Sequence, residues 1–314
     1  MVSSEDFSAG GESATIAAMV ATILERQEKN YKPGTVARRG LHSKSLGVVR
    51  ASLQVRNLPK ELQVGLFATP YSYDAVLRFS NGGLGPTAPD ALPNIRGVAL
   101  KVLGVPGEKL LPGEEDSTEQ DFIMANYPTF FASTAEQMLL LMQGKIFKLL
   151  VERPAILIDA VKATAKITES VLDIDYFSQV TYRFGRKSCK YSLFHQAGTA
   201  ARPNINLLDN DYLRNALTDQ LQKGTAKFTL CVQIQQGNED DQDPTEQWSG
   251  PQIELADLTV LQIDEPIEES DGEELSFNPY RTLAEHEPIG WAGRMRRAVY
   301  AADLEWRARK NGTA

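Results

Sequence analysis

Near its C-terminus the chain reads RMRRAVYAADLEWR, residues 294–307, and this stretch gives the strongest indication of its fold. On a helix, Arg296, Tyr300 and Arg307 fall at i, i+4 and i+11, within about 60° of one another. A close positive charge lowers the pKa of a phenol, and a phenolate is a good ligand for ferric iron. Arg307 can then bind a carboxylate beside the metal. This helix face indicates a haem-binding site. The alternative is that Tyr300 is an ordinary core residue.

A second stretch, RRGLHSK at residues 38–44, carries one of the three histidines of the chain. Arg39 lies three residues before His42. A neutral imidazole that faces a bound metal is a suitable proton shuttle for peroxide chemistry. The alternative is a solvent-facing histidine in a basic strand. Taken together, the two stretches favour a haem site built from both ends of the chain.

Composition excludes several classes of protein. The chain has 314 residues, 42% hydrophobic content and a net charge of −8, which argues against a nucleic-acid partner. Cys189 and Cys231 form neither a CxxC pair nor a disulfide framework, so we expect a reducing, cytoplasmic location. Acidic residues precede the apolar run at the N-terminus, so we expect no secretory signal. No apolar run is long enough to span a membrane.

The first third of the chain combines one helix with several strands. Residues 13–29 predict a helix, followed by an extended arm at 32–34. Between 46 and 103, β-branched runs are separated by Gly, Pro and Asn, which predicts strands. These runs are GVVRASLQV (47–55), VGLF (64–67), AVLRFS (75–80) and GVALKVL (97–103).

The remainder of the chain predicts further helices and strands. Residues 134–172 predict two helices broken at Pro154, and QMLLLMQGKIFKLL within them is buried or lies against another surface. A hairpin within 179–194 and two later strands, at 226–235 and 254–263, follow. Strands dominate the middle and helices gather at the ends. We expect an α+β fold with an antiparallel barrel or large curled sheet.

In its motifs and their order, the chain resembles the haem catalase superfamily, in its short, single-domain, catalase-related peroxidase branch. RRGLHSK is similar to the segment that holds the catalase distal histidine, and LRFSNG with IRGVALKV resembles the strand pair that follows it. DFIMANYPTFF (121–131), DPTEQW (243–248) and ELADLTVLQ (254–262) are similar to later catalase segments. The resemblance implies a catalase-like antiparallel β-barrel with helices at both ends and a C-terminal haem-ligand helix. It divides the chain into an N-terminal helix and arm, 1–32, and a haem-binding domain, 33–314.

The same resemblance implies roles for residues of the C-terminal helix. Tyr300 is the expected proximal ligand of the iron, as tyrosine is in catalases, and Arg296 is expected to keep it ionised. Arg307 is expected to hold a haem propionate together with Arg39 and Arg78.

On the opposite side, His42 is the expected distal base. The Ser80 hydroxyl is expected to bond the far ring nitrogen of His42 and to fix its tautomer. A gapless match puts Ala125 where catalases place a distal asparagine, so Asn126 supplies that amide only after a shift of one residue.

Two departures from full-length catalases bear on the substrate. Gly82 stands where catalases keep a valine that guards the channel, so we expect wider access to the iron. The chain lacks the long wrapping arm and the C-terminal extension, so we expect neither an interlocked tetramer nor bound NADPH.

The implied function is a haem b peroxidase with weak catalase activity, acting on hydrogen peroxide or an organic or lipid hydroperoxide with a small organic reductant. Two alternatives are a fatty-acid hydroperoxide isomerase of the allene oxide synthase type and a non-enzymatic haem-binding protein. Catalase-related allene oxide synthases carry threonine just before the distal histidine, whereas this chain has Leu41. A homodimer and a peripheral membrane contact are the further partners that we consider.

Overall fold

A computed structural model gives the fold and describes residues 9–83, 85–164, 166–270 and 272–313. The start of the segment considered as a secretory signal, residues 1–8, lies outside the described residues, as does Leu84. No helix in the described ranges is long and apolar enough to cross a bilayer.

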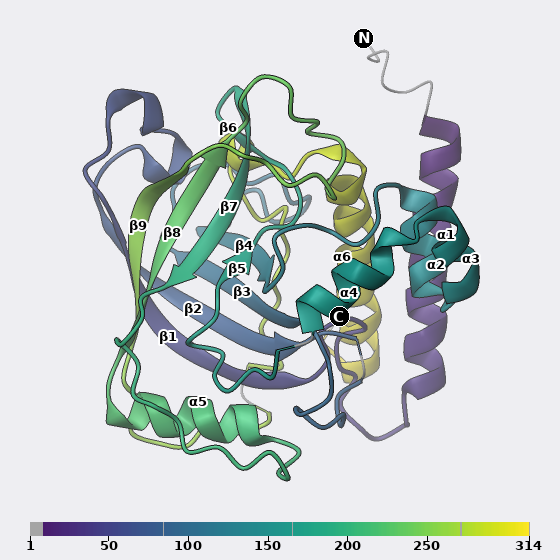
Figure 1. The fold of residues 1–314 in the computed structure, drawn as a ribbon, viewed down its shortest axis with the longest axis horizontal. Coiled ribbons are helices and arrows are strands. Elements are labelled where there is room, and N and C mark those ends of the chain that lie inside the picture. The colour runs from purple at the N-terminus through teal and green to yellow at the C-terminus, as the bar shows by residue number, and fades with distance from the viewer. Residues whose placement is uncertain (1–8, 84, 165, 271, 314) are drawn as a thin grey trace.

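The strands form one antiparallel sheet that closes on itself (Figure 1). The hydrogen-bonded order is β5-β4-β3-β2-β1-β9-β8-β7-β6, and β5 also pairs with β7, so eight strands make a barrel and β6 extends it. The strands are β1 (Ser45–Val55), β2 (Ser72–Asn81), β3 (Arg96–Leu103), β4 (Glu119–Ala125), β5 (Tyr176–Phe177), β6 (Tyr182–Phe184), β7 (Lys187–His195), β8 (Ala226–Ile234) and β9 (Gln252–Val260). The α+β fold with an antiparallel barrel is therefore confirmed.

Strand alternation explains why the barrel forms. In β1, Val49, Ala51 and Leu53 are buried, whereas Arg50 and Gln54 between and beyond them are exposed. Such a period of two places one set of side chains inside the barrel and the other outside. In β7 and β8 most residues are buried in unbroken runs instead, and both Cys189 and Cys231 are buried there as free thiols.

The helices pack against the outside of the barrel. They are α1 (Ala9–Asn30), α2 (Ala135–Met142), α3 (Ile146–Glu152), α4 (Ala155–Thr164), α5 (Tyr212–Lys223) and α6 (Gly290–Asn311). Figure 1 shows α1 beside α6, and the two helices are in contact. Met19 and Ile23 of α1 belong to the same apolar core as the barrel.

Three elements differ from the sequence-based expectation. The run 64–67 is a 3₁₀ turn, Gly65–Phe67, because Leu66 and Phe67 turn into the core together rather than on alternate faces. The two helices expected at 134–172 are three, since Gly144 takes a positive φ of 69° and ends α2 before Pro154 breaks the chain again. The helix α5 was not expected.

The register of β2, β3 and β4 sets up one wall of the functional site. Ser80 pairs with Gly97, which pairs with Ala125, and Arg78 pairs with Ala99 two rows away. The intervening row, Phe79–Val98–Met124, belongs to the barrel core. A period of two therefore turns Arg78 and Ser80 together to the outside, toward α6.

Candidate functional site

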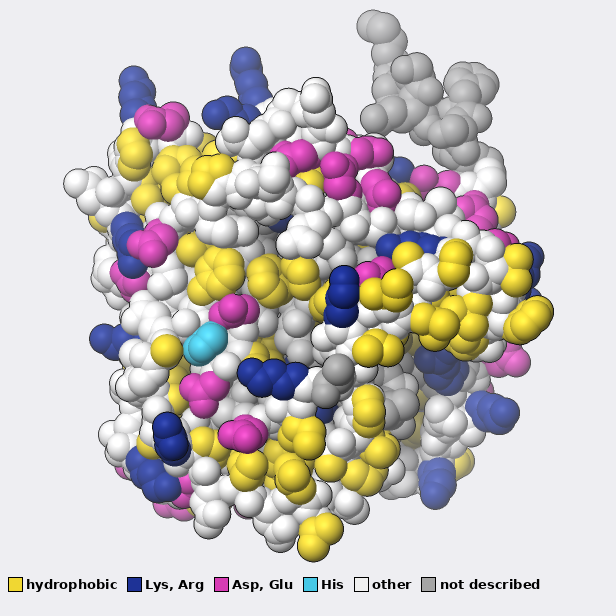
Figure 2. All heavy atoms as spheres, in the orientation of Figure 1, with side chains coloured by type: hydrophobic (Ala, Val, Ile, Leu, Met, Phe, Trp, Pro, Cys, Tyr) yellow, Lys and Arg dark blue, Asp and Glu magenta, His cyan; other side chains and the backbone are white. Residues whose placement is uncertain are grey.

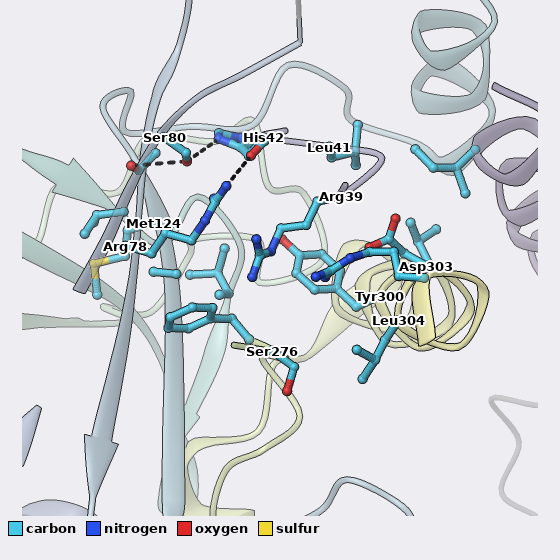
Figure 3. A pocket seen from close by; sticks show the side chains of 18 residues that line it. Arg39, Leu41, His42, Arg78, Ser80, Met124, Ser276, Tyr300, Asp303 and Leu304 are labelled. Atoms are coloured by element: carbon cyan, nitrogen blue, oxygen red, sulfur yellow. Dashed lines mark hydrogen bonds between the residues drawn. The ribbon is translucent and has the colours of Figure 1, made fainter. Parts of the chain in front are cut away.

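A cavity of about 80 Å³ lies between the barrel wall and α6 (Figure 3). Its lining residues are Ile23, Arg39, Leu41, His42, Arg78, Ser80, Gly97, Val98, Ala99, Ile123, Met124, Ser276, Phe277, Val299, Tyr300, Asp303, Leu304 and Arg307. The structure thus brings together six of the eight residues that the sequence singled out, and it leaves Arg296 and Asn126 outside the lining.

Tyr300 faces the cavity from α6. Burial raises the pKa of the phenol, while the positive charges of Arg296, Arg78 and Arg39 act in the opposite direction. Arg296 therefore lowers the pKa of Tyr300, as expected, but burial raises this pKa by more. A phenol with a raised pKa keeps its proton at neutral pH unless a bound cation displaces it.

Arg296 lies behind the cavity lining, in the packing that supports α6. Its guanidinium donates to the carbonyl of Ser178 at 3.2 Å and lies 5.8 Å from the centre of the Phe130 ring. It is nearly buried, so its charge acts on Tyr300 and His42 through a medium of low polarity.

His42 enters the cavity from the segment before β1. Its Nδ1 lies 3.0 Å from the Ser80 hydroxyl, whose oxygen is 3.5 Å from the Gly97 carbonyl. From this network we assign the proton to Nδ1, which donates to Ser80, while Ser80 donates to Gly97. The other ring nitrogen, Nε2, is then the basic one. Burial, reinforced by Arg78 and Arg296, lowers the pKa of His42 to about 4, so the ring is neutral at pH 7.

Gly97 makes this arrangement sterically allowed, and sequence reasoning missed it. A Cβ atom at Gly97 would lie 2.5 Å from Nδ1 and 2.6 Å from Cε1 of His42, and 3.0 Å from the Ser80 hydroxyl. Only glycine leaves room for the ring. A glycine inside a strand often marks such a close approach, so the signal was present in the sequence.

The backbone of His42 is held in an uncommon conformation. Its φ is 52°, in the left-handed region that non-glycine residues adopt rarely. Arg78 donates to the His42 carbonyl at 3.0 Å (Figure 3). Strain of this kind persists where the surroundings overdetermine it, which is common at functional sites.

Three guanidinium groups contact Glu273 beside the cavity, two at its carboxylate and one at its main-chain carbonyl. Arg39 and Arg78 lie 3.3 Å and 3.9 Å from the carboxylate oxygens of Glu273, and Arg307 donates to the Glu273 carbonyl at 2.7 Å. Burial, followed by the neighbouring guanidinium charge, lowers the pKa of Arg39 to about 10 and that of Arg78 to about 9. The cluster carries an excess of positive charge that a bound anion would balance.

Several polar atoms of this cluster have no hydrogen-bond partner. They are Nε of Arg78, Nε of Arg307 and Oε1 of Glu273, all buried among the described residues. Buried polar atoms are normally paired, so unpaired atoms at a cavity point to a ligand. Glu273 was not expected from the sequence, because it lies in an acidic loop without periodicity.

The arm that carries Arg39 and His42 is fastened to α6. Asp303 accepts from the Gly40 amide at 2.8 Å, and a Cβ atom at Gly40 would lie 2.8 Å from Ile23. Asn311 accepts from the Ala37 amide at 2.8 Å and donates to the Ala37 carbonyl at 3.2 Å. Asp303 lies three residues after Tyr300, so its place on the same helix face was foreseeable.

Two residues named from the sequence lie elsewhere. The Asn126 side chain accepts from the Arg96 amide at 2.8 Å, and Ala125 lies in the row of Ser80 and Gly97. Asn126 therefore offers no amide to the cavity. Gly82 lines a neighbouring surface groove, and a Cβ atom there would lie 2.8 Å from the Asn94 side chain, so Gly82 does not widen the cavity.

Comparisons with known proteins support the catalase-like fold. No protein-family model matches the chain. It is 25% identical over 252 residues to a catalase-related peroxidase from Mycolicibacterium paratuberculosis, covering 74% of this chain and 77% of that protein. A bacterial catalase superposes with a TM-score of 0.66 at 17% identity, and catalase A from Saccharomyces cerevisiae with 0.69 at 14%. The chain is related to the catalase superfamily.

The catalase likeness covers most of this chain but only part of the solved catalases. The superpositions include 88% and 90% of this chain, and 58% and 64% of the bacterial and yeast catalases. This catalase relative therefore spans less than two thirds of their length.

Proposed function

We propose that this catalase relative is a haem-dependent enzyme that processes hydroperoxides, acting mainly as a peroxidase with weak catalase activity. One observation carries the proposal: the imidazole of His42 and the phenol of Tyr300 line the same cavity from different elements, with three guanidinium groups among its surroundings. The proposed substrate is hydrogen peroxide or an organic hydroperoxide, and the proposed second substrate is a small organic reductant.

The residues present fit haem b, which the resemblance to catalases implies. Arg39, Arg78 and Arg307 carry three positive charges, and Glu273 carries one negative charge. Asp303 also lines the cavity and interacts with Arg39 and Arg307, and the three guanidinium groups still outnumber the two carboxylates. The propionates of haem b are anions that this excess would attract, and the unpaired Nε atoms of Arg78 and Arg307 are available as donors. Tyr300 would ligate the iron, which supplies the redox chemistry that cleaves the O–O bond.

The proton steps fall to His42. Its neutral Nε2 accepts the proton of the incoming hydroperoxide and returns it to the leaving oxygen, which departs as water or an alcohol. The bond from Nδ1 to Ser80 keeps the proton on the far nitrogen and holds the ring in place. Leu41, Val299 and Leu304 give the cavity apolar walls that strengthen the charge interactions inside it.

The two alternative functions have less support. An isomerase of the allene oxide synthase type would be expected to carry threonine at position 41, where Leu41 lines the cavity. A haem carrier needs no base in its cavity. In this chain the ring of His42 is held by a hydrogen bond to Ser80, and its backbone adopts an uncommon conformation, which a carrier would not require.

The test uses the purified protein reconstituted with haem b. We expect a Soret band, turnover of tert-butyl hydroperoxide with a phenolic donor, and slower dismutation of hydrogen peroxide. His42→Ala should keep the Soret band and lose turnover by about 100-fold or more. Tyr300→Phe should change the ferric spectrum or lose haem. A wild-type protein that binds no haem, or a His42→Ala variant with full turnover, would contradict the proposal.

A further inference from the structure

An apolar ridge is exposed on the outer side of α3 and α4. Seven of the thirteen large hydrophobic side chains that are exposed in the described residues lie between 146 and 167, with Phe147 84% and Val151 71% exposed. Figure 2 shows apolar side chains gathered over α3 and α4. We call this surface the α3–α4 ridge, and it comprises Ile146, Phe147, Val151, Leu157, Ile158, Val161 and Ile167.

The ridge remains exposed although its helices already have a core. Leu149 of α3 and Ile156 of α4 are buried with Leu140 of α2 in a small apolar cluster of their own. Arg153, between the helices, donates to the Phe131 carbonyl and pairs with Asp159 at 3.0 Å. These contacts fix the helices to the body of the protein. The ridge is therefore surplus apolar surface, which usually marks an interaction site.

The charges around the ridge are opposite to those of the whole chain. Residues 145–169 contain five basic and three acidic residues, whereas the chain carries a net charge of −8. Lys145, Lys162 and Lys166 are exposed and make no ion pair with any described residue. Apolar side chains interspersed with lysines are typical of helices that lie in the interface of an anionic membrane.

A second copy of this chain fits the ridge less well. In a two-fold dimer the same patch meets itself, so the lysines of one subunit would face those of the other. Their repulsion would oppose the association, and the apolar contact would have to overcome it. An anionic lipid surface instead offers phosphate groups to the lysines and acyl chains to Phe147 and Val151.

We propose that the α3–α4 ridge docks this protein on an anionic membrane surface. The apolar side chains enter the interface, and the lysines contact lipid phosphates. The docking does not depend on haem. Its consequence for chemistry rests on the proposed function: the segment that anchors the ridge, Tyr127–Phe131, follows β4, whose Ile123 and Met124 line the cavity. Docking would place the protein, and with it the cavity, on a membrane in which lipid hydroperoxides can form.

The test is flotation of the full chain with vesicles, without peroxide. We expect binding to phosphatidylcholine vesicles that contain phosphatidylglycerol, at least about tenfold weaker binding to pure phosphatidylcholine, and release at about 0.5 M salt. Phe147→Glu combined with Val161→Glu should weaken binding about tenfold or more. Lys162→Glu combined with Lys166→Glu should abolish the preference for the anionic lipid.

Leu208→Glu is the matched control, because Leu208 is 93% exposed outside the ridge, and this variant should bind as the wild type does. Unchanged thermal unfolding will show that the variants are folded. The proposal is overturned if the wild type floats with neither kind of vesicle, or if the ridge variants bind as well as Leu208→Glu. It is also overturned if sedimentation shows a dimer that Phe147→Glu dissociates. Vesicle binding can fail while haem and turnover remain, so this result is distinguishable from failure of the proposed function.

Discussion

The Ser80 hydroxyl lies 3.0 Å from Nδ1 of His42, on the strand that also carries Arg78. Arg78 bonds the His42 carbonyl, so one strand holds both the ring and the backbone of this residue. Because alternate residues of a strand share a face, Ser80 and Arg78 reach His42 together. The base is thus oriented by the barrel and not by the helix opposite.

Ser80→Ala removes the acceptor of the Nδ1 proton and leaves the cavity shape almost unchanged. A lost hydrogen bond of this kind costs about 1–2 kcal/mol, so peroxide turnover should fall roughly tenfold while haem affinity stays constant. Stopped-flow kinetics with one hydroperoxide measure the effect. Ser80→Thr, which keeps a hydroxyl, should recover part of the rate; an alanine variant as fast as wild type would mean that Ser80 does not orient the base.

Gly97→Ala should displace His42, because the added Cβ would lie 2.5 Å from Nδ1. We expect a loss of turnover of about 100-fold, comparable with removal of the base itself. The expected cause is a moved ring, which proton NMR of the His42 ring or a crystal structure would reveal. Gly11→Ala serves as the control, since a Cβ at Gly11 meets no atom within 4 Å. Equal activities of the two variants would refute the steric argument.

Arg39→Met should weaken haem b binding by about tenfold or more, because a charge-assisted bond to a propionate is lost. Haem dimethyl ester, which has no free propionates, provides the sharper comparison. The wild type should prefer haem b over the ester, and the variant should lose part of that preference. Arg309→Met, at a side chain 57% exposed near the end of α6, is the control. If all three proteins showed the same preference for haem b over the ester, Arg39 would not hold a propionate.

Acid should destabilise the fold through two buried histidines. Burial lowers the pKa of His42 to about 4 and of His286 to about 3, against an ordinary value near 6.5. Between pH 6.5 and 4 the unfolded chain binds more protons than the folded one, so stability falls as the pH falls. His42 alone contributes about 3 kcal/mol to this loss.

The measurement is urea unfolding of the haem-free protein at several pH values, for wild type and His42→Gln. The variant should lose less stability than the wild type between pH 6.5 and 4. Parallel curves would mean that His42 titrates normally. In the reconstituted enzyme the acid limb of kcat/KM should lie below pH 6.5, since neutral His42 persists in more acidic solution.

Helical periodicity made part of the site predictable. Arg296, Tyr300 and Arg307 share a face of α6, and Asp303 could have been added by the same rule. Strand alternation explains why Asn126 does not face the cavity, because a shift of one residue turns a side chain to the other face of the sheet. Glu273 reaches the arginine cluster from an irregular loop, and no local pattern predicts such a contact. The stretch QMLLLMQGKIFKLL, expected to be buried or to lie against another surface, is divided: Leu140, Met142 and Leu149 are buried, whereas Ile146 and Phe147 are exposed. A local pattern does not show which side of such a helix the rest of the chain covers.

The fastening of the arm to α6 has a mechanical consequence. Ala37 and Gly40 bond to Asn311 and Asp303, so the segment that ends in His42 is tied at two points to the helix that carries Tyr300. These bonds join the arm to α6, while Ser80 and Arg78 join His42 to the barrel, so the separation of His42 from Tyr300 is set from both sides. If the arm slid along α6 by one helical turn, His42 would move by about 5 Å relative to Tyr300. The placement of the arm that carries His42 thus depends in part on bonds near the other end of the chain, more than 260 residues away in sequence.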